Sequence, residues 1–340
     1  MNPLSRRKFI KQASCAAMGS TAFLSTALNL GLINTISARP HIMENTEDYK
    51  AMVCILLAGG CDTHNVLVPT DPIPYAAYSN IRGPMALDKE DPSKLLPLNN
   101  MNGESFHVHA GMQRVQSLFN EGNLAFISNI GTLIEPIQNY ADYDSGLKRI
   151  PIGLYSHRDQ IMHWQTSVPQ NRSAIGFGGR MADILQDMNS INEVSLNISM
   201  SGKNPFSAGN STSEIAIKTT NSNDLGLDGI RSSASNAGFL NDAKSNAIKS
   251  MAEAQYSNIF HQTIGQLTKE SIQSNEILKI AFEQINPLSS NFSATSLSQN
   301  LKKVAETISV RNFLGTKRQI FFITYGGWDH HSDVIPKMEA

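Results

Sequence analysis

The sequence predicts an α/β fold with a mostly parallel central sheet, and three observations lead to that prediction. Two apolar stretches, 52–57 and 320–325, hold the β-branched and aromatic residues typical of strands covered on both faces. Each stretch runs into a Gly-Gly pair and then into Asp and His residues, a pattern expected where strands end at a ligand-binding edge. Strand-like and helix-like stretches follow one another along the chain, an order that favours parallel strands.

The N-terminal segment 1–38 has the features of a twin-arginine export signal. Arg6 and Arg7 precede an aromatic–aliphatic pair, a weakly apolar stretch covers 16–33, and residues 36–38 fit a cleavage site. A basic amphipathic helix or a membrane anchor is the alternative, and two asparagines and many small residues disfavour it. We therefore expect a periplasmic or otherwise exported bacterial protein. Its partner would be the twin-arginine export machinery, and no stable membrane span would remain after signal removal.

The elements that follow the first apolar stretch alternate between loops and regular structure. Residues 66–75 lead into a loop that is expected to run to Gly103. Within it, 95–98 (Leu-Leu-Pro-Leu) predict an ordered turn because proline interrupts both helical and strand periods. Helical spacing over 110–122 and a strand-like run over 124–130 complete a strand–helix–strand unit. This unit predicts a parallel sheet.

The second half of the chain predicts a polar insertion between regular elements. Periodicity indicates helices over 157–166, 181–188 and 296–313 and a strand over 194–200. Ser, Asn, Thr and Gly dominate 201–236, which predicts an exposed, loosely structured insertion. Two or three amphipathic helices are expected over 238–286. Residues 39–340 thus predict one large domain, with a helical segment over 238–313.

Charge and cysteine content exclude two classes of protein. Lys+Arg total 28 and Asp+Glu total 29 in 340 residues, so the chain lacks the basic footprint of a nucleic-acid partner. Three cysteines are too few for a disulfide framework. Cys54 and Cys61 are expected to stay unbridged because the strand and turn between them hold the sulfurs apart.

Acidic and histidine residues after the two apolar stretches are the candidate metal ligands. Asp62 follows the first stretch, where a carboxylate is fixed but reachable. Asp329 and His331 are one residue apart, so an extended backbone puts both side chains on one side, and His330 lies between them. The alternative is that an Asp after glycine hydrogen-bonds its own turn. Two such strand ends in one chain favour the metal site.

Ser156 and His157 are the candidate catalytic residues. Adjacent residues on a helix point in different directions, so these two do not form a nucleophile–base pair by themselves. A serine activated by a metal ion would need no histidine base. The competing interpretation is a helix cap followed by a surface histidine. His107 and His109 alternate as on a strand or on the face of a loop, and we interpret them as structural.

Four stretches in this order carry a family resemblance: 55–69 (ILLAGGCDTHNVLVP), 122–133 (GNLAFISNIGTL), 155–164 (YSHRDQIMHW) and 326–331 (GGWDHH). Through them and its twin-arginine signal, the chain resembles the domain-of-unknown-function family 1501. That family consists of exported bacterial proteins of the alkaline-phosphatase-like superfamily.

The resemblance implies an alkaline-phosphatase-like α/β/α sandwich in which acids and histidines at strand ends bind one or two divalent metal ions. These ions would serve hydrolysis of phosphate or sulfate esters, in a small molecule or a cell-surface polymer. By position, Asp62 resembles the first-strand metal ligand and Ser156 the nucleophile. Asp329 and His331 resemble ligands of a Gly-Trp-Asp-Thr-His motif, with His330 in place of the threonine.

The sequence departs from this family after residue 331. The family continues with a helix, a strand with a Thr/Ser-Glu-Phe-Gly-Arg-like segment, and a late Asp-His-Gly, whereas this sequence stops at Ala340. We therefore expect a sheet and a metal site that are incomplete on the C-terminal side. There are two alternatives to a hydrolase. One is a non-catalytic exported binding or assembly protein that uses 201–236 as its contact surface, and the other is an inactive truncated remnant.

Overall fold

The computed structural model describes residues 48–100, 103–189, 194–217 and 239–339. The predicted signal and residues 218–236 of the predicted insertion lie outside these ranges. The chain divides into two units. The first contains the residues up to Leu56 and Leu133–Thr324, and the second contains Leu57–Thr132 and Tyr325–Ala340.

A four-stranded sheet in the order β1-β7-β5-β6 forms the centre of the first unit. Its strands are β1 (Lys50–Leu57), β5 (Asn197–Ser199), β6 (Ile215–Ala216) and β7 (Arg318–Tyr325). β5 pairs in parallel with both β6 and β7. Lys50 N–H donates to Lys317 O at one end of β1 and Ala58 N–H donates to Tyr325 O at the other, so β1 also runs parallel to β7. The predicted α/β fold with a parallel sheet is confirmed.

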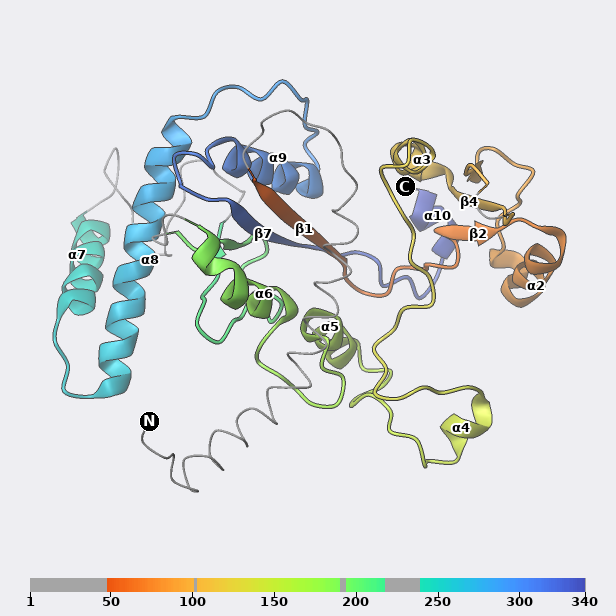
Figure 1. The fold of residues 1–340 in the computed structure, drawn as a ribbon, viewed down its shortest axis with the longest axis horizontal. Coiled ribbons are helices and arrows are strands. Elements are labelled where there is room, and N and C mark those ends of the chain that lie inside the picture. The colour runs from red at the N-terminus through yellow and green to blue at the C-terminus, as the bar shows by residue number, and fades with distance from the viewer. Residues whose placement is uncertain (1–47, 101–102, 190–193, 218–238, 340) are drawn as a thin grey trace, which may run out of the picture. The chain divides into compact units, whose positions relative to one another are not determined.

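Helices cover both faces of this sheet (Figure 1). The helical segments of the unit are α4 (Tyr140–Asp144), α5 (His157–Thr166), α6 (Phe177–Leu185), η3 (Gln186–Met188), α7 (Phe239–Glu253), α8 (Ile259–Glu283) and α9 (Ser296–Ser309). Phe321 of β7 packs with Leu278 of α8 and Val304 of α9 on one face. Because successive side chains of a strand point to opposite faces, its neighbour Phe322 packs with Met181 of α6 on the other face.

The second unit contains a three-stranded antiparallel sheet in the order β2-β4-β3. Its elements are β2 (Leu67–Pro69), α2 (Pro72–Arg82), η1 (Gly83–Met85), β3 (Leu95–Pro97), β4 (Phe106–His109), η2 (Ala110–Met112), α3 (Gln113–Asn120) and α10 (Val334–Glu339). Val68, Tyr78, Leu87 and Leu95 form its core, and Ile335 of α10 packs against them. His107 and His109 lie on β4, which is one of the two placements, strand or loop, that their alternation left open.

The prediction of a loop from Tyr75 to Gly103 is wrong, because this range holds most of α2 and all of β3. α2 begins after Asp71 with prolines in its first turn, a start signal that the prediction passed over. The predicted turn at 95–98 is also wrong, since Leu95 and Leu96 pair with β4. Proline is tolerated there because β3 is an edge strand, whose outer side needs no N–H donor.

The predicted strand at 124–130 is absent, and this described stretch has no regular structure. Phe126 packs on the Phe119 ring, with centroids 5.5 Å apart, whereas Ile127 is 69% and Ile130 55% exposed. An apolar run becomes a strand only with a partner strand, and none of the described strands pairs with it. The preceding helix, predicted over 110–122, is a 3-10 turn (η2) followed by α3.

The described part of the predicted insertion, 201–217, is not loosely structured. Phe206 is 3% exposed and stacks on Phe322 at 4.6 Å, and Ser207 is fully buried. The Asn197 side chain donates to Ser207 O at 2.7 Å, which ties the segment to β5. By contrast, the predicted helix over 157–166 is confirmed as α5, and α7 and α8 confirm the helical pattern over 238–286.

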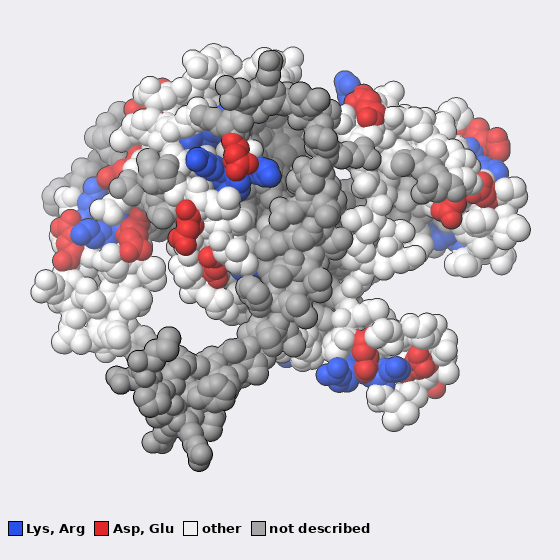
Figure 2. Space-filling model, in the orientation of Figure 1, with Lys and Arg blue, Asp and Glu red and all other residues white. Residues whose placement is uncertain are grey.

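The surface of the described residues carries both signs of charge. On the face in Figure 2, Lys and Arg lie interspersed with Asp and Glu rather than gathered by sign. Among the described helices, none combines the length and the apolar character that a membrane crossing requires.

Candidate functional site

The loops that follow β1 and β7 contact each other within the second unit. Ala58 N–H donates to Tyr325 O at 2.9 Å, and Trp328 N–H donates to Ala58 O at 3.4 Å. Gly59 has a φ of +118°, and a Cβ built on it would stand 2.6 Å from the backbone N of Asp329. Glycine is therefore needed at this position both for its backbone angle and for the close approach of the two loops.

Asp329 and His331 form a carboxylate–imidazole pair in the loop after β7. Asp329 Oδ1 lies 2.9 Å from His331 Nε2, with the two side chains 51% and 81% exposed. Their contact agrees with the prediction that residues one apart point to the same side. His330 lies against Trp328 instead, with ring centroids 6.2 Å apart. Within the described part of the second unit, no third Asp, Glu, His or Cys joins the pair closely enough to share an ion.

Asp62 is held by an arginine in this structure. The Arg82 guanidinium at the end of α2 donates to Asp62 Oδ2, and both side chains are largely buried, with 18% and 14% exposed. A guanidinium next to a carboxylate neutralises it and repels an approaching cation. As arranged here, Asp62 serves as an ion-pair partner that fixes its loop to α2.

Asn65 makes a second attachment between this loop and α2. Its side chain is fully buried, Oδ1 accepts a hydrogen bond from Tyr78 Oη at 2.7 Å, and Nδ2 donates to Met85 O at 3.1 Å. Leu87 N–H in turn donates to Tyr78 Oη at 2.8 Å. The Asp-Thr-His-Asn stretch thus has a structural role here. No local sequence pattern indicated this role, because its partners lie on a helix that was predicted as loop.

Ser156 caps α5, as the competing interpretation predicted. Its Oγ accepts a hydrogen bond from Asp159 N–H at 3.3 Å, and His157 opens the helix with an exposed ring. The Asp159 carboxylate binds the Arg172 guanidinium through Nε at 2.8 Å and Nη2 at 3.3 Å. The Arg172 hydrogen bond is the main reason that the pKa of Asp159 lies below its ordinary value. The catalytic roles of Ser156 and His157 stay predictions.

His163 is a buried residue of α5 whose environment the sequence did not reveal. Its ring is fully buried, and neither nitrogen has a hydrogen-bond partner among the described residues. Burial lowers the pKa of His163, partly opposed by the negative charge of Asp159, so the ring is neutral at pH 7. The two cysteines in the described ranges, Cys54 and Cys61, are unbridged as expected, and burial raises the pKa of each thiol.

Comparison with known proteins gives no relative for this chain. No family model matches it, and neither the curated proteins nor the solved structures contain a match. The resemblance to family 1501 therefore stays a proposal, and the geometry of the two loops is the structural observation that can support it.

Proposed function

We propose that this chain is an exported metal-dependent hydrolase of phosphate or sulfate esters, of the alkaline-phosphatase-like type. The observation that supports the proposal is the contact between the loops after β1 and β7. It brings the Asp329–His331 pair to the carboxyl ends of parallel strands, where α/β proteins collect their ligands. Export by the twin-arginine machinery is part of the proposal and rests on the sequence of 1–38.

The donor chemistry of Asp329 and His331 suits a divalent ion. A carboxylate oxygen and an imidazole nitrogen in contact, on exposed side chains, are ligands that zinc and similar metals accept. His330 is the further candidate on the same segment. Asp62 suits an ion only after its separation from Arg82. A bound ion would polarise the ester and lower the pKa of an attacking hydroxyl. The sequence resemblance alone makes Ser156 the candidate attacking hydroxyl of the proposal, with His157 beside it in the chain.

Metal analysis of the full chain, together with hydrolysis assays on p-nitrophenyl phosphate and sulfate, tests this function. The Asp329→Ala/His331→Ala double variant should lose bound divalent metal and retain less than about one-hundredth of the activity. Even the loss of a group that only supports a metal ligand typically lowers metal affinity or activity about 10- to 100-fold, and this variant removes two ligands. Asp144→Ala/His261→Ala is the matched control, since it removes one exposed carboxylate and one exposed imidazole from the first unit. It should change neither readout.

The Asp62–Arg82 ion pair favours a second candidate, a non-catalytic exported binding or assembly protein. A carboxylate that is paired with an arginine holds its loop in place and is not available to bind a metal ion. The same measurements separate the two candidates. Folded wild-type protein that carries no divalent metal and hydrolyses neither ester would contradict the hydrolase and leave the binding protein and the inactive remnant as the candidates.

A further inference from the structure

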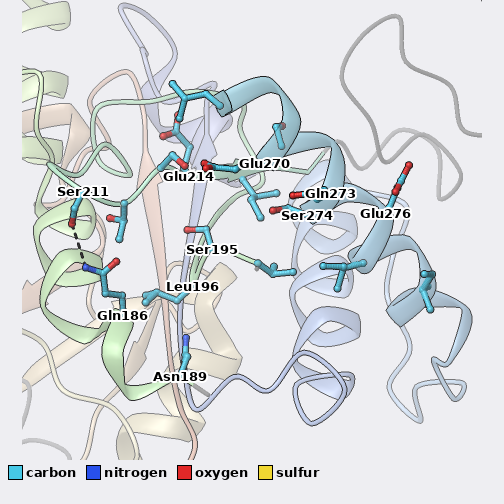
Figure 3. A pocket seen from close by; sticks show the side chains of 18 residues that line it. Gln186, Asn189, Ser195, Leu196, Ser211, Glu214, Glu270, Gln273, Ser274 and Glu276 are labelled. Carbon is cyan, nitrogen blue, oxygen red and sulfur yellow. Dashed lines mark hydrogen bonds between the residues drawn. The ribbon is translucent and has the colours of Figure 1, made fainter. Parts of the chain in front are cut away.

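A cavity of about 620 Å³ lies in the first unit, between α8 and the segments that lead into β5 and β6 (Figure 3). Its lining includes residues 194–196, which precede β5, and Ser213 and Glu214, which precede β6. The cavity is therefore at the amino ends of these parallel strands. Asp329 follows the carboxyl end of its strand, so the cavity shares no residue with the proposed metal site.

One wall of the cavity is held in place by Asp183 of α6. Its carboxylate accepts hydrogen bonds from the backbone N–H groups of Asn210 at 2.7 Å, Ser211 at 3.0 Å and Thr212 at 2.8 Å. The Gln186 side chain donates to Ser211 Oγ at 3.3 Å, the dashed line in Figure 3. These bonds fix the loop that presents Ser211, Thr212 and Ser213, so this wall is formed before any ligand arrives.

The opposite wall is one face of α8. Leu278 and Ala281 on this helix are fully buried in the core of the sheet. Glu270, Ser274 and Ile277 line the cavity, and Figure 3 shows Glu270 and Ser274 on this helix. The packing of Leu278 fixes α8 against the sheet, and the cavity-lining side chains of the same helix are thereby held in position.

The lining is acidic and rich in hydroxyl and amide groups, with an apolar part. Its carboxylates are Glu214, Glu270 and Glu276, and its aliphatic side chains include Leu196, Leu267, Ile277 and Ile280. Among the 18 described residues that line the cavity, none is Lys, Arg, His or aromatic. The volume falls in the range of about 300–1,000 Å³ that small-molecule sites occupy.

We propose that this cavity binds a small aliphatic amine in its ammonium form. Glu214 from the strand side and Glu270 from α8 would neutralise the ammonium groups, while the aliphatic side chains accommodate the methylene chain. Glu276 contributes less, because Lys249 lies 3.8 Å from its carboxylate. The lack of an aromatic ring in the lining disfavours a ligand that depends on stacking, such as most sugars.

Isothermal titration of the full chain with spermidine tests the proposal, with the neutral disaccharide trehalose as the comparison ligand. Wild type should bind spermidine and not trehalose. Glu214→Gln and Glu270→Gln should each weaken spermidine binding about tenfold. Glu283→Gln is the matched control, because it removes an exposed carboxylate from the same helix outside the cavity. It should leave binding unchanged.

Ser271→Trp fills the cavity without altering its charge and should abolish spermidine binding, with folding checked by circular dichroism. The proposal is overturned if wild type binds no spermidine or prefers trehalose. It is equally overturned if Glu283→Gln weakens binding as much as Glu214→Gln and Glu270→Gln do. Unchanged binding to Ser271→Trp would overturn it as well, since the amine would then sit on outer carboxylates.

Discussion

Gly59 and Gly60 are adjacent residues with similar backbone angles and different surroundings. Their φ values are +118° and +111°, both in the region that side chains disfavour. A Cβ at Gly59 would stand 2.6 Å from Asp329 N, whereas a Cβ at Gly60 meets nothing within 4 Å among the described residues. The pair separates the cost of backbone strain from the cost of a steric clash.

Gly59→Ala and Gly60→Ala should therefore differ in stability. Each costs about 1–3 kcal/mol through its backbone angle, and Gly59→Ala should cost at least about 1 kcal/mol more because the loop after β7 must move away. Urea unfolding of the two variants against wild type measures the difference. Equal losses of unfolding free energy would show that the contact between Gly59 and Asp329 does not stabilise the protein.

Local spacing predicted part of the candidate site. Asp329 and His331 are separated by one residue, and that spacing alone was enough to predict their contact. The cap at Ser156 also depends only on the residues that come after it. The Asp62–Arg82 pair joins residues 20 positions apart through α2, so no local pattern could reveal it. The sequence therefore led to the contact between Asp329 and His331 but not to the Arg82 guanidinium that binds the Asp62 carboxylate.

At the scale of elements, Asp183 on α6 fixes the loop at 209–212 and gives it a pH dependence. Burial by itself raises the pKa of Asp183, but the N–H and O–H donors of Asn210, Ser211 and Thr212 together outweigh it, so the pKa lies below its ordinary value of 3.8. The folded state then binds protons more weakly than the unfolded state. The stabilisation is complete above the ordinary pKa and is lost as the pH falls through the lowered one.

Asp183→Asn should lower the free energy of unfolding by about 1–3 kcal/mol at pH 7, because hydrogen bonds to a charged group are lost. As the pH falls below the ordinary carboxyl pKa of 3.8, the difference from wild type should shrink, because the wild-type carboxyl then protonates as well. Urea unfolding from about pH 2 to pH 7 measures both effects. Asp187→Asn is the control, an exposed carboxylate of η3. A difference between wild type and Asp183→Asn that stays constant with pH would contradict this account.

The elements that the sequence predicted well are those with a strong local pattern. β7 is buried along Arg318–Ile323, and its β-branched and aromatic residues identified it. α5 and the two helices within 238–286 were found from their periodicity. The run at 124–130 has the same composition as a strand but pairs with none of the strands in the described ranges. Pairing is a property of the sheet, so composition could not distinguish these cases.

At the scale of the whole molecule, β1 is the feature that departs most from expectation. Its composition predicted a strand covered on both faces, but β1 lies at the edge of the sheet, with β7 as its neighbour. Met52, Cys54 and Leu56 pack against the core on one face, and burial raises the pKa of Cys54 to about 11. On the other face Val53 is 38% and Ile55 40% exposed.

An eight-residue edge strand with no charge after Lys50 lacks the protection that edge strands normally carry. On the side away from β7, its backbone groups pair with none of the described strands, and together with its apolar face they favour pairing with another chain. The Val53→Lys/Ile55→Lys double variant should therefore raise the concentration at which the protein self-associates, as measured by light scattering over a concentration series. Lysines at these positions point away from the packed face, so the unfolding midpoint should change little.

Ile73→Lys on α2 is the control, because Ile73 is 84% exposed but lies on a helix, which has no strand edge that could pair. Equal effects of both changes would mean that added charge, rather than protection of the β1 edge, limits association.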